Sequence, residues 1–421
     1  MSFFPKIRLR KEVEEYLRSA YHNSELLATL GEEEAEQKFL RLQNHLSHPP
    51  AFTTVRVNTR LISVENAKQL LSEEIHKIRR GMLLPNMEDI TSISAVICRR
   101  SLKQHPVQVI VGAQCGNAVL RGAHVYSAGI LSASKWMKVG DEVSVYSDVE
   151  ARCKRGATEF DGTKVFVGNG ISELSRSEIF CSNSPIKGKG IRMTEPVYLS
   201  PSFDNVLPGY IFLQGEVIAM DKIANKVEKV KQKASVLKLN SIQAFCYNST
   251  KAVTPDSGDS QGPGPPFPPE SFDRVLLDAP CSGMGQRPNM SCALSLKELT
   301  SYQPLQRKLF STAVSLLKPG GTLVYSTCTI TLSENEQLVA WALTTFPCLQ
   351  LHPQDPRIGG DGLMGAGLSP DQLKLLQRFD PSLAELHDFD INDGTLEDQD
   401  RTLLANTDTI GFFIAKFVKQ G

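Results

Sequence analysis

Hydrophobic and polar positions follow different periods along the chain and divide it into three regions. Between Glu32 and Leu46, apolar residues recur at helical spacing and predict an amphipathic helix. The run from Phe52 to Thr59 alternates like a strand. A helix led by Ser63 follows, and we expect its inward face to carry Val64, Ala67, Leu70 and Leu71. These elements predict a small α+β unit over residues 1–105.

The second region, residues 106–200, consists of short β-rich runs with Gly or Asp turns roughly every dozen residues. The clearest runs are VQVIVGAQ, AHVYSAGI, EVSVYSDV and TKVFVGNG. Many short, evenly spaced strands of this kind predict a small β-barrel.

The third region, residues 201–421, alternates strands with helices, which favours an α/β fold with a parallel sheet. The predicted strands are EVIAMD, IQAFCY, RVLLDAP and TLVYSTC. Between them lie a lysine-rich helix, Lys222 to Leu239, and a helix opened by Pro304; another helix starts at Glu334. In the lysine-rich helix we expect three apolar residues to be buried: Val227, Val230 and Leu237. The loop from Pro255 to Glu270 is too rich in Pro and Gly to be core.

Composition narrows the class of protein but not its activity. The 46 Lys and Arg residues balance 46 Asp and Glu residues, so net charge by itself gives no support to nucleic-acid binding. No run of about 18 apolar residues predicts a membrane span. The nine cysteines are odd in number and show no C-x-x-C spacing, so neither a disulfide framework nor a metal site is indicated. We therefore expect reduced thiols and a protein of the cytoplasm. We also expect a monomer.

Two predicted strands end close to a cysteine. The apolar run Val275–Leu277 leads into Asp278 and Cys281, and the strand Thr322–Tyr325 leads into Cys328. A strand–helix–strand crossover makes these strands parallel, which places both cysteines at the carboxyl edge of one sheet, where open α/β sheets bind ligands. A free cysteine is most often a small buried hydrophobe. Two at one ligand-binding edge favour a functional pair.

The residues around both cysteines resemble the paired motifs of the Nop/Sun-domain RNA cytosine-5 methyltransferases. The motifs are DAPCSG at residues 278–283 and YSTCT at 325–329, while RVNT at 56–59 resembles the N-terminal signature and GFFIA at 411–415 the closing strand. The resemblance implies a class I methyltransferase-type, Rossmann-like sheet, an N-terminal RNA-binding unit and S-adenosylmethionine as cofactor.

The barrel resembles a PUA RNA-binding domain, in particular at RGA 121–123 and GDEV 140–143. A PUA insertion at this place is similar to the sixth member of the family, a tRNA cytosine-5 methyltransferase that acts on acceptor stems with a 3′ CCA end. The resemblance therefore implies RNA, and tRNA in particular, as the partner.

The chemistry of this family explains a need for two thiols. Carbon 5 of cytosine is a poor nucleophile, so a thiolate first adds to carbon 6, and loss of the carbon 5 proton after methylation expels that thiol. By resemblance, Cys328 is the nucleophile, Cys281 assists release of the methylated RNA, and Asp278 contacts the cytosine or the cofactor edge. Strand and helix order alone leaves open which cysteine attacks.

Two further strand ends are candidates for cofactor binding. Asp221 ends the strand Val217–Met220, where a carboxylate can accept both ribose hydroxyls of S-adenosylmethionine; the alternative is an N-cap for the next helix. Asn248 stands where the family expects an acid near the adenine, and its amide oxygen can still accept a hydrogen bond.

One expected element is missing. The family opens its sheet with a strand, a glycine-rich loop of the type Cys-Ala-Ala-Pro-Gly-Gly-Lys, and a helix, but here Tyr210–Gln214 runs directly into Gly215 and Glu216. The strands ending at Asp221 and Asp278 must then pair directly or leave a gap of roughly 9.6 Å, two strand spacings. We hypothesise a shortened form of the family, truncated near 214–216, in which donor binding is weak or absent.

In the barrel, the RNA candidates implied by the PUA resemblance are Arg121, Tyr126, Lys154 and Arg155. Basic side chains neutralise phosphates, and a tyrosine offers a stacking face for an unpaired base. The alternative for Lys154 and Arg155 is a solvated turn. Two function classes remain, an active methyltransferase and a catalytically silent RNA-binding isoform. A cysteine hydrolase is disfavoured because neither cysteine motif contains a histidine.

Overall fold

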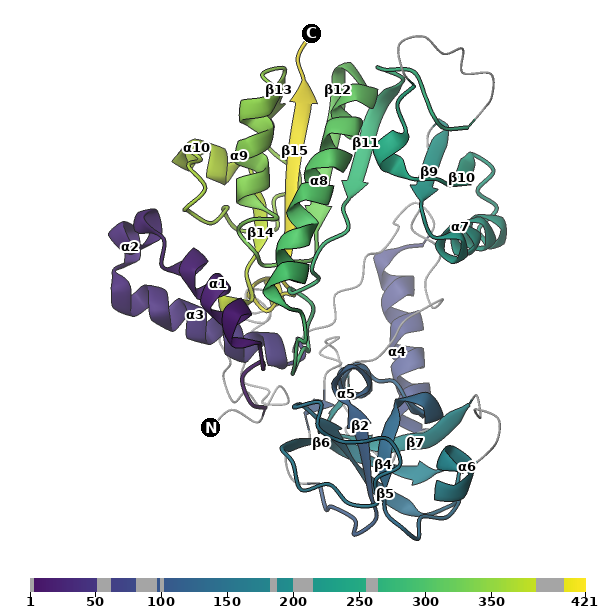
Figure 1. Ribbon diagram of the computed structural model, residues 1–421. Helices are drawn as coiled ribbons and strands as arrows, with labels where there is room; N and C mark the ends of the chain where they lie inside the picture. The colour runs from purple at the N-terminus through teal and green to yellow at the C-terminus, as the bar shows by residue number, and fades with distance from the viewer. Residues whose placement is uncertain are drawn as a thin grey trace.

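The computed structural model describes residues 4–50, 62–80, 97–98, 102–181, 188–199, 215–254, 264–383 and 405–421. Three segments discussed above lie outside the described residues: the strand predicted at Phe52–Thr59, the run Tyr210–Gln214 before the missing element, and most of the loop from Pro255 to Glu270. The described residues form an N-terminal group of helices, a β-rich body and an α/β body (Figure 1).

The N-terminal helices pack against the α/β body (Figure 1). They are α1 (Lys11–Tyr21), α2 (Ser24–Leu30) and α3 (Glu32–Ser47). Helix α3 confirms the predicted amphipathic helix, and its apolar residues Ala35, Phe39, Leu42 and Leu46 are all buried. Phe39, Leu42 and Leu46 share a hydrophobic cluster with Met284 and Ile330, which follow the two cysteine motifs. The helices therefore support the loops that carry the cysteines.

Helix α4 (Val64–Arg80) follows Ser63, whose side chain accepts a hydrogen bond from the backbone N–H of Asn66 at 3.1 Å. Ala67 and Leu71 are buried as predicted, but Val64 and Leu70 are exposed, so half of the predicted inward face is wrong. Residues four apart lie one above the other on a helix, and here only that narrow stripe is covered.

The β-rich body confirms the predicted run of short strands. Six strands form one mixed sheet in the order β3-β7-β6-β5-β2-β4, in which β2 runs parallel to β5 and the other neighbours are antiparallel. Its elements are β2 (Gln108–Gly112), α5 (Ala113–Leu120), β3 (Val125–Tyr126), η1 (Ser127–Gly129), β4 (Ile130–Ala133), β5 (Glu142–Asp148), β6 (Lys164–Ser172), α6 (Arg176–Phe180) and β7 (Lys189–Pro196). At its two ends, β1 (Ile97–Cys98) pairs antiparallel with β8 (Tyr198–Leu199). The chain therefore enters and leaves this body at neighbouring positions, as an insertion requires.

The α/β body is built on the sheet β11-β12-β15-β13, with β14 also paired to β15. Strand β11 runs parallel to β12, which confirms the predicted crossover, and β15 runs antiparallel to β12. The elements are β11 (Phe272–Asp278), α8 (Leu296–Leu316), β12 (Leu317–Thr327), α9 (Glu336–Thr345), β13 (Leu349–Leu351), α10 (Pro370–Lys374), β14 (Gln377–Phe379), η3 (Pro381–Leu383) and β15 (Phe412–Lys419).

Helix α8 starts earlier than predicted. Its N-cap is Ser295, which forms a capping box with Glu298, and Pro304 lies inside the helix. The prediction that Pro304 opens the helix was wrong, because the capping box satisfies the first free N–H groups about two and a half turns upstream. The longer helix spans the crossover between the two cysteine-bearing strands (Figure 1).

The sheet is interrupted where the missing strand was expected. Strand β9 (Val217–Asp221) pairs parallel with β10 (Ile242–Cys246), and these strands form a separate two-stranded sheet beside α7 (Ala224–Val236) and η2 (Ser249–Lys251). Among the described residues, no strand joins β9 to β11, and both lie apart in Figure 1. Leu276 of β11 is 72% exposed, an unusual state for a central strand. Of the two alternatives, direct pairing or a gap, the structure has the gap.

Helix α7 is also affected by the gap in the sheet. Val227 is buried as predicted, but Val230 and Leu237 are exposed, contrary to the prediction, and so is Val236. The helix covers only a two-stranded sheet, so part of its apolar face has no strand to pack against. The periodicity predicted the helix correctly, while the burial depended on a neighbour that this part of the chain lacks.

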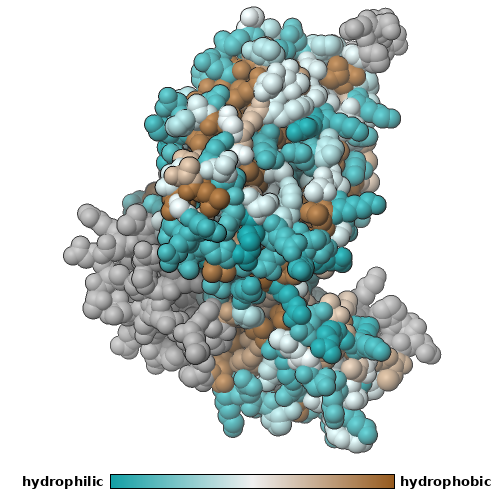
Figure 2. Space-filling view, turned by 60° about the vertical axis from the view of Figure 1, so that its left-hand side comes forward, coloured by the Kyte–Doolittle hydropathy of each residue, from teal (hydrophilic) through white to brown (hydrophobic). Residues whose placement is uncertain are grey.

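On the face shown in Figure 2, apolar side chains reach the surface in scattered patches among hydrophilic ones, over both the upper and the lower body. No helix within the described ranges is long and apolar enough to cross a membrane.

Candidate active site

Cys281 and Cys328 lie in direct contact beyond the carboxyl ends of two neighbouring parallel strands. In the pairing of β11 with β12, Asp278 lies opposite Ser326, so the segments that follow the two strands lie side by side. The two sulfur atoms are 3.4 Å apart, and both side chains are half-buried. The backbone is fixed here as well, because the Gly285 N–H donates to the Cys328 carbonyl at 3.0 Å.

The two thiols differ in acidity. A hydrogen bond from Cys281, with a further one from the Gln286 side chain, lowers the pKa of Cys328 below its usual range. The same interaction, together with burial, raises the pKa of Cys281. The proton of the pair therefore stays on Cys281, and the Cys328 sulfur is the thiolate. A thiolate is the nucleophilic form of cysteine.

This asymmetry predicts a pH dependence. With a lowered pKa, Cys328 stays ionised as the pH falls below the usual thiol value of about 8.5. Its alkylation by iodoacetamide, measured for the Cys328 peptide by mass spectrometry, should reach half of its maximal rate below that pH. Cys281→Ala removes the first donor and should move the midpoint upward. A midpoint that is normal in the parent chain, or unmoved in the variant, would contradict the assigned polarity.

Asp278 lies at the end of β11 and accepts a hydrogen bond from the Ser326 hydroxyl at 3.1 Å. Its side chain is exposed at the same edge as the two cysteines. A carboxylate there can accept hydrogen bonds from a bound base or from a cofactor.

A buried carboxylate that the sequence reasoning missed lies beside the cysteines. Glu334 accepts hydrogen bonds from both the N–H and the hydroxyl of Ser282, at 2.9 and 2.6 Å. It also accepts from the Gln306 amide at 2.9 Å and from the Thr331 hydroxyl at 2.8 Å. Its hydrogen-bond partners come from separate segments of the chain, so no local sequence pattern predicted that Glu334 belongs to the site. The only signal was the polar run Glu334–Glu336 beside an otherwise apolar helix.

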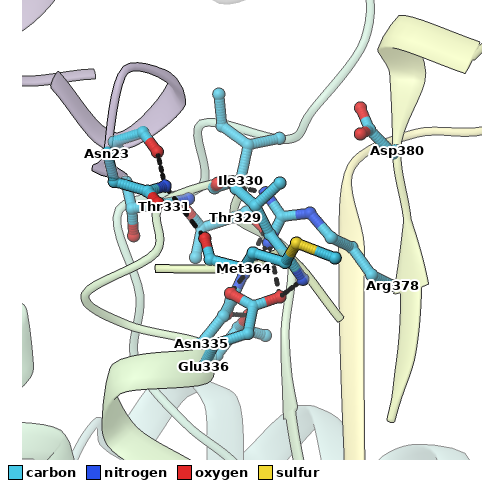
Figure 3. Close-up of polar contacts among 12 residues, drawn as sticks. Asn23, Thr329, Ile330, Thr331, Asn335, Glu336, Met364, Arg378 and Asp380 are labelled. Carbon is cyan, nitrogen blue, oxygen red and sulfur yellow. Dashed lines mark hydrogen bonds and ion pairs between the residues drawn. The ribbon is translucent and has the colours of Figure 1, made fainter. Parts of the chain in front are cut away.

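A second buried network contacts the residues next to Cys328 through Asn335, Glu336 and Arg378 (Figure 3). The Arg378 guanidinium donates to both carboxylate oxygens of Glu336, at 2.9 and 3.0 Å, and to the Ile330 carbonyl at 2.6 Å. Asn335 accepts from the Thr327 hydroxyl at 2.6 Å and donates to the Thr329 carbonyl at 3.0 Å. The two Asn335 bonds fix the backbone on both sides of Cys328. The Glu336 carboxylate contacts this segment indirectly, through Arg378 and the Ile330 carbonyl.

The donor candidates lie on both sides of the gap in the sheet. Asp221 ends β9, and its carboxylate accepts the Ile223 N–H at 2.8 Å, so it closes a local turn; the N-cap of α7 is Ile223 itself, without a side-chain bond. Asn248 caps η2 by accepting from Thr250 at 3.2 Å. Within the described residues no hydrogen bond joins either of them to Asp278 or to the cysteines.

These residues fit only part of S-adenosylmethionine. Asp221 and Asn248 stand at the carboxyl ends of parallel strands, where they can hold a ribose and an adenine. The strand between β9 and β11 would carry the loop for the methionine end, and no described strand lies there. The donor site is therefore incomplete in the described part of the chain.

The RNA candidates of the β-rich body have different surroundings. Tyr126 is 59% exposed, and Lys154 and Arg155 are exposed on one turn. The Arg121 side chain is exposed, and partial desolvation lowers the pKa of its guanidinium. Arg155 instead donates to the Ile130 carbonyl at 2.6 Å and lies over the Phe180 ring. Arg155 thus has a structural role that spacing did not predict.

Within the described ranges, no group of three or more His, Cys, Asp or Glu side chains could hold a metal ion.

Comparison with known proteins agrees with this geometry. The family model described as 16S rRNA methyltransferase RsmB/F matches residues 209–418. The tRNA (cytosine(72)-C(5))-methyltransferase NSUN6 of Homo sapiens is 58% identical, over 100% of this chain and 99% of the relative; that of Mus musculus is 56% identical, over 100% and 98%. The crystal structure of NSun6 from Pyrococcus horikoshii with SFG superposes with a TM-score of 0.65 at 23% identity, covering 100% of this chain and 99% of that one.

The chain therefore belongs to the Nop/Sun-domain family of RNA cytosine-5 methyltransferases, whose methyl donor is S-adenosylmethionine. The fold is the class I methyltransferase type with a PUA-like body, as predicted. The alignment with the human relative spans 465 positions, 44 more than the 421 residues of this chain. Positions of the relative that have no counterpart in this chain account for the difference.

Proposed function

We propose that this chain modifies carbon 5 of a cytosine in tRNA near the acceptor 3′ CCA end, with Cys328 as the nucleophile and a weakened affinity for the methyl donor. The observation that carries the proposal is the contact of two thiols of opposite pKa shift at the carboxyl edge of one parallel sheet. The tRNA target is supported by the names of the two mammalian relatives, which act on cytosine 72.

In this reaction Cys328 adds to carbon 6 of the base, and the electrons move towards carbon 5, which then accepts a methyl group supplied by S-adenosylmethionine when it is bound. Cys281 lies beside the departing Cys328 sulfur and carries the proton of the pair. Proton loss from carbon 5 and release of the Cys328 thiol complete the reaction. Asp278 is exposed at the same edge, and we propose that it contacts the base or the donor.

The proposed domains correspond to the three regions of the sequence. Residues 1–105 form the N-terminal RNA-binding unit, 106–200 the PUA body and 201–421 the methyltransferase domain. We further propose that the protein is a monomer and that it is located in the cytoplasm, where thiols stay reduced, because eight of its nine cysteines are free.

The decisive experiment is transfer of labelled methyl groups to a CCA-ended tRNA transcript at saturating donor. Incorporation at a single cytosine of the acceptor stem supports the proposal, and the same transcript without its CCA end is the control. Transfer that ignores the CCA end would contradict the assigned target.

The interrupted sheet favours a second candidate, a catalytically silent RNA-binding protein. β9 and β11 are unjoined within the described residues, while the six-stranded body is intact. This candidate replaces the first if the chain retains tRNA binding but transfers no methyl group at any donor concentration.

Variants of the β-rich body test the RNA contacts. Tyr126→Ala should weaken binding of CCA-ended tRNA by about 1–3 kcal/mol, the usual contribution of one stacked base. Arg121→Ala and Lys154→Ala should reduce the slope of log affinity against log salt by about 1 each, because each removes one phosphate contact. Fluorescence anisotropy measures all three.

Lys138→Ala is the matched control, since Lys138 is an exposed lysine of the same body outside the candidate set. Equal salt slopes in the Lys138 and Lys154 variants would show a diffuse charge effect and contradict a specific surface. Arg155→Ala should instead lower the melting temperature, because it removes the bond to the Ile130 carbonyl.

A further inference from the structure

Glu334 is buried with 0% exposure between the end of β12 and the start of α9, although its side chain ends in a carboxyl group. Transfer of a carboxylate to the protein interior is costly unless hydrogen bonds replace its water. Here four donors do so at 2.6–2.9 Å: the Ser282 N–H, the Ser282 hydroxyl, the Thr331 hydroxyl and the Gln306 amide. Its own carbonyl accepts from the buried Tyr325 hydroxyl at 2.7 Å.

These partners lead directly to both cysteines. Ser282 is the residue after Cys281, and its hydroxyl lies 2.7 Å from the hydroxyl of Thr329, the residue after Cys328. On the other side of Cys281, the Gln306 amide that bonds Glu334 also donates to the Pro280 carbonyl at 2.9 Å. One carboxylate therefore ties together the two loops whose sulfurs are in contact.

We propose that Glu334 is a positioning residue, which holds the Cys281 and Cys328 loops at the separation where one thiol donates to the other. A buried carboxyl group is a poor choice for stability alone, because well-packed apolar residues often serve as well or better. The directional hydrogen bonds of Glu334 can instead fix the distance between the Cys281 loop and the Cys328 loop. The inference deepens the proposed function, since it assigns the control of Cys328 acidity to a third residue.

The chain contains an internal control two residues away. Glu336 is equally buried, and its carboxylate bonds Arg378 and the Leu363 N–H, at 2.9 Å each. It makes no bond to the residues that flank either cysteine in the described structure (Figure 3). Removal of the Glu336 carboxylate therefore disturbs the core but leaves intact the hydrogen bonds that connect the Cys281 and Cys328 loops.

The test is the pH profile of Cys328 alkylation, read peptide by peptide, together with the melting temperature. Glu334→Ala and Ser282→Ala should move the alkylation midpoint upward by on the order of one pH unit, because loosened loops weaken the hydrogen bond from Cys281. Glu334→Gln should keep most of the parent profile, since its amide has the same shape and the hydroxyl partners can reorient to accept from it. Glu336→Gln should lower the melting temperature and leave the midpoint in place.

An unmoved midpoint in Glu334→Ala, or an equal shift in Glu336→Gln, overturns the proposal. If Glu334→Ala shows no cooperative melting, Ser282→Ala decides in the same way, because it deletes the 2.6 Å bond to Glu334 and the 2.7 Å contact with Thr329. Alkylation needs neither RNA nor donor. A positioning role that holds in a chain without methyl transfer would therefore separate this inference from the proposed function.

Discussion

Cys328→Ala is expected to reduce methyl transfer to a CCA-ended tRNA to background, whereas Cys281→Ala should accumulate a covalent protein–RNA adduct. The first variant lacks the thiolate that adds to the base. The second keeps the Cys328 nucleophile but lacks the thiol in contact with it, so the adduct forms and is not resolved. At saturating donor, denaturing gels with labelled tRNA show the adduct as a band of reduced mobility, and methyl incorporation is measured in parallel.

Cys181→Ala is a suitable control, because Cys181 is an exposed free cysteine of the β-rich body, far from either motif in the sequence. It should transfer methyl groups like the parent chain and give no adduct band. If Cys281→Ala gave no adduct while Cys328→Ala did, the two roles would have to be exchanged. If neither variant differed from the parent chain, the thiol mechanism would be wrong for this protein.

Donor affinity is the second large expected effect. By calorimetric titration we expect S-adenosylmethionine to bind this chain more weakly than micromolar. The family's glycine-rich loop supplies backbone amides and a lysine to the donor, and hydrogen bonds to charged groups contribute about 1.5–3 kcal/mol each. The loss of two such bonds corresponds to roughly a hundredfold or more in Kd.

A chimeric protein tests whether the missing segment is the cause of weak donor binding. Insertion of the corresponding strand, loop and helix of the human relative between Gln214 and Gly215 should restore donor affinity and raise the melting temperature. The inserted strand would pair with β9 and β11 and cover Leu276. An insert of equal length made of Gly and Ser is the control and should restore neither. Micromolar binding by the parent chain would show that the donor site is complete without the segment.

The order of elements was predictable because local patterns and crossover rules determine it. The apolar run Val275–Leu277, the crossover helix and the strand before Cys328 sufficed to place two cysteines at one edge. The start of α8 was also present in the sequence, as the Ser295–Glu298 capping box, but Pro304 was the more conspicuous signal. That error concerned which of two local signals starts a helix.

The sequence by itself determined the strands, the helices and the edge at which the chemistry-bearing side chains gather, because hydrophobic periodicity and chain direction are local properties. Only the tertiary structure decided which of those side chains meet. Glu334 became a member of the site through Ser282 and Gln306, which lie 52 and 28 positions away. Val230 and Leu237 have the spacing of buried residues and are exposed, because burial depends on a neighbouring element and not on the residue. Contact between distant segments is a property of the assembled fold, and no local pattern encodes it.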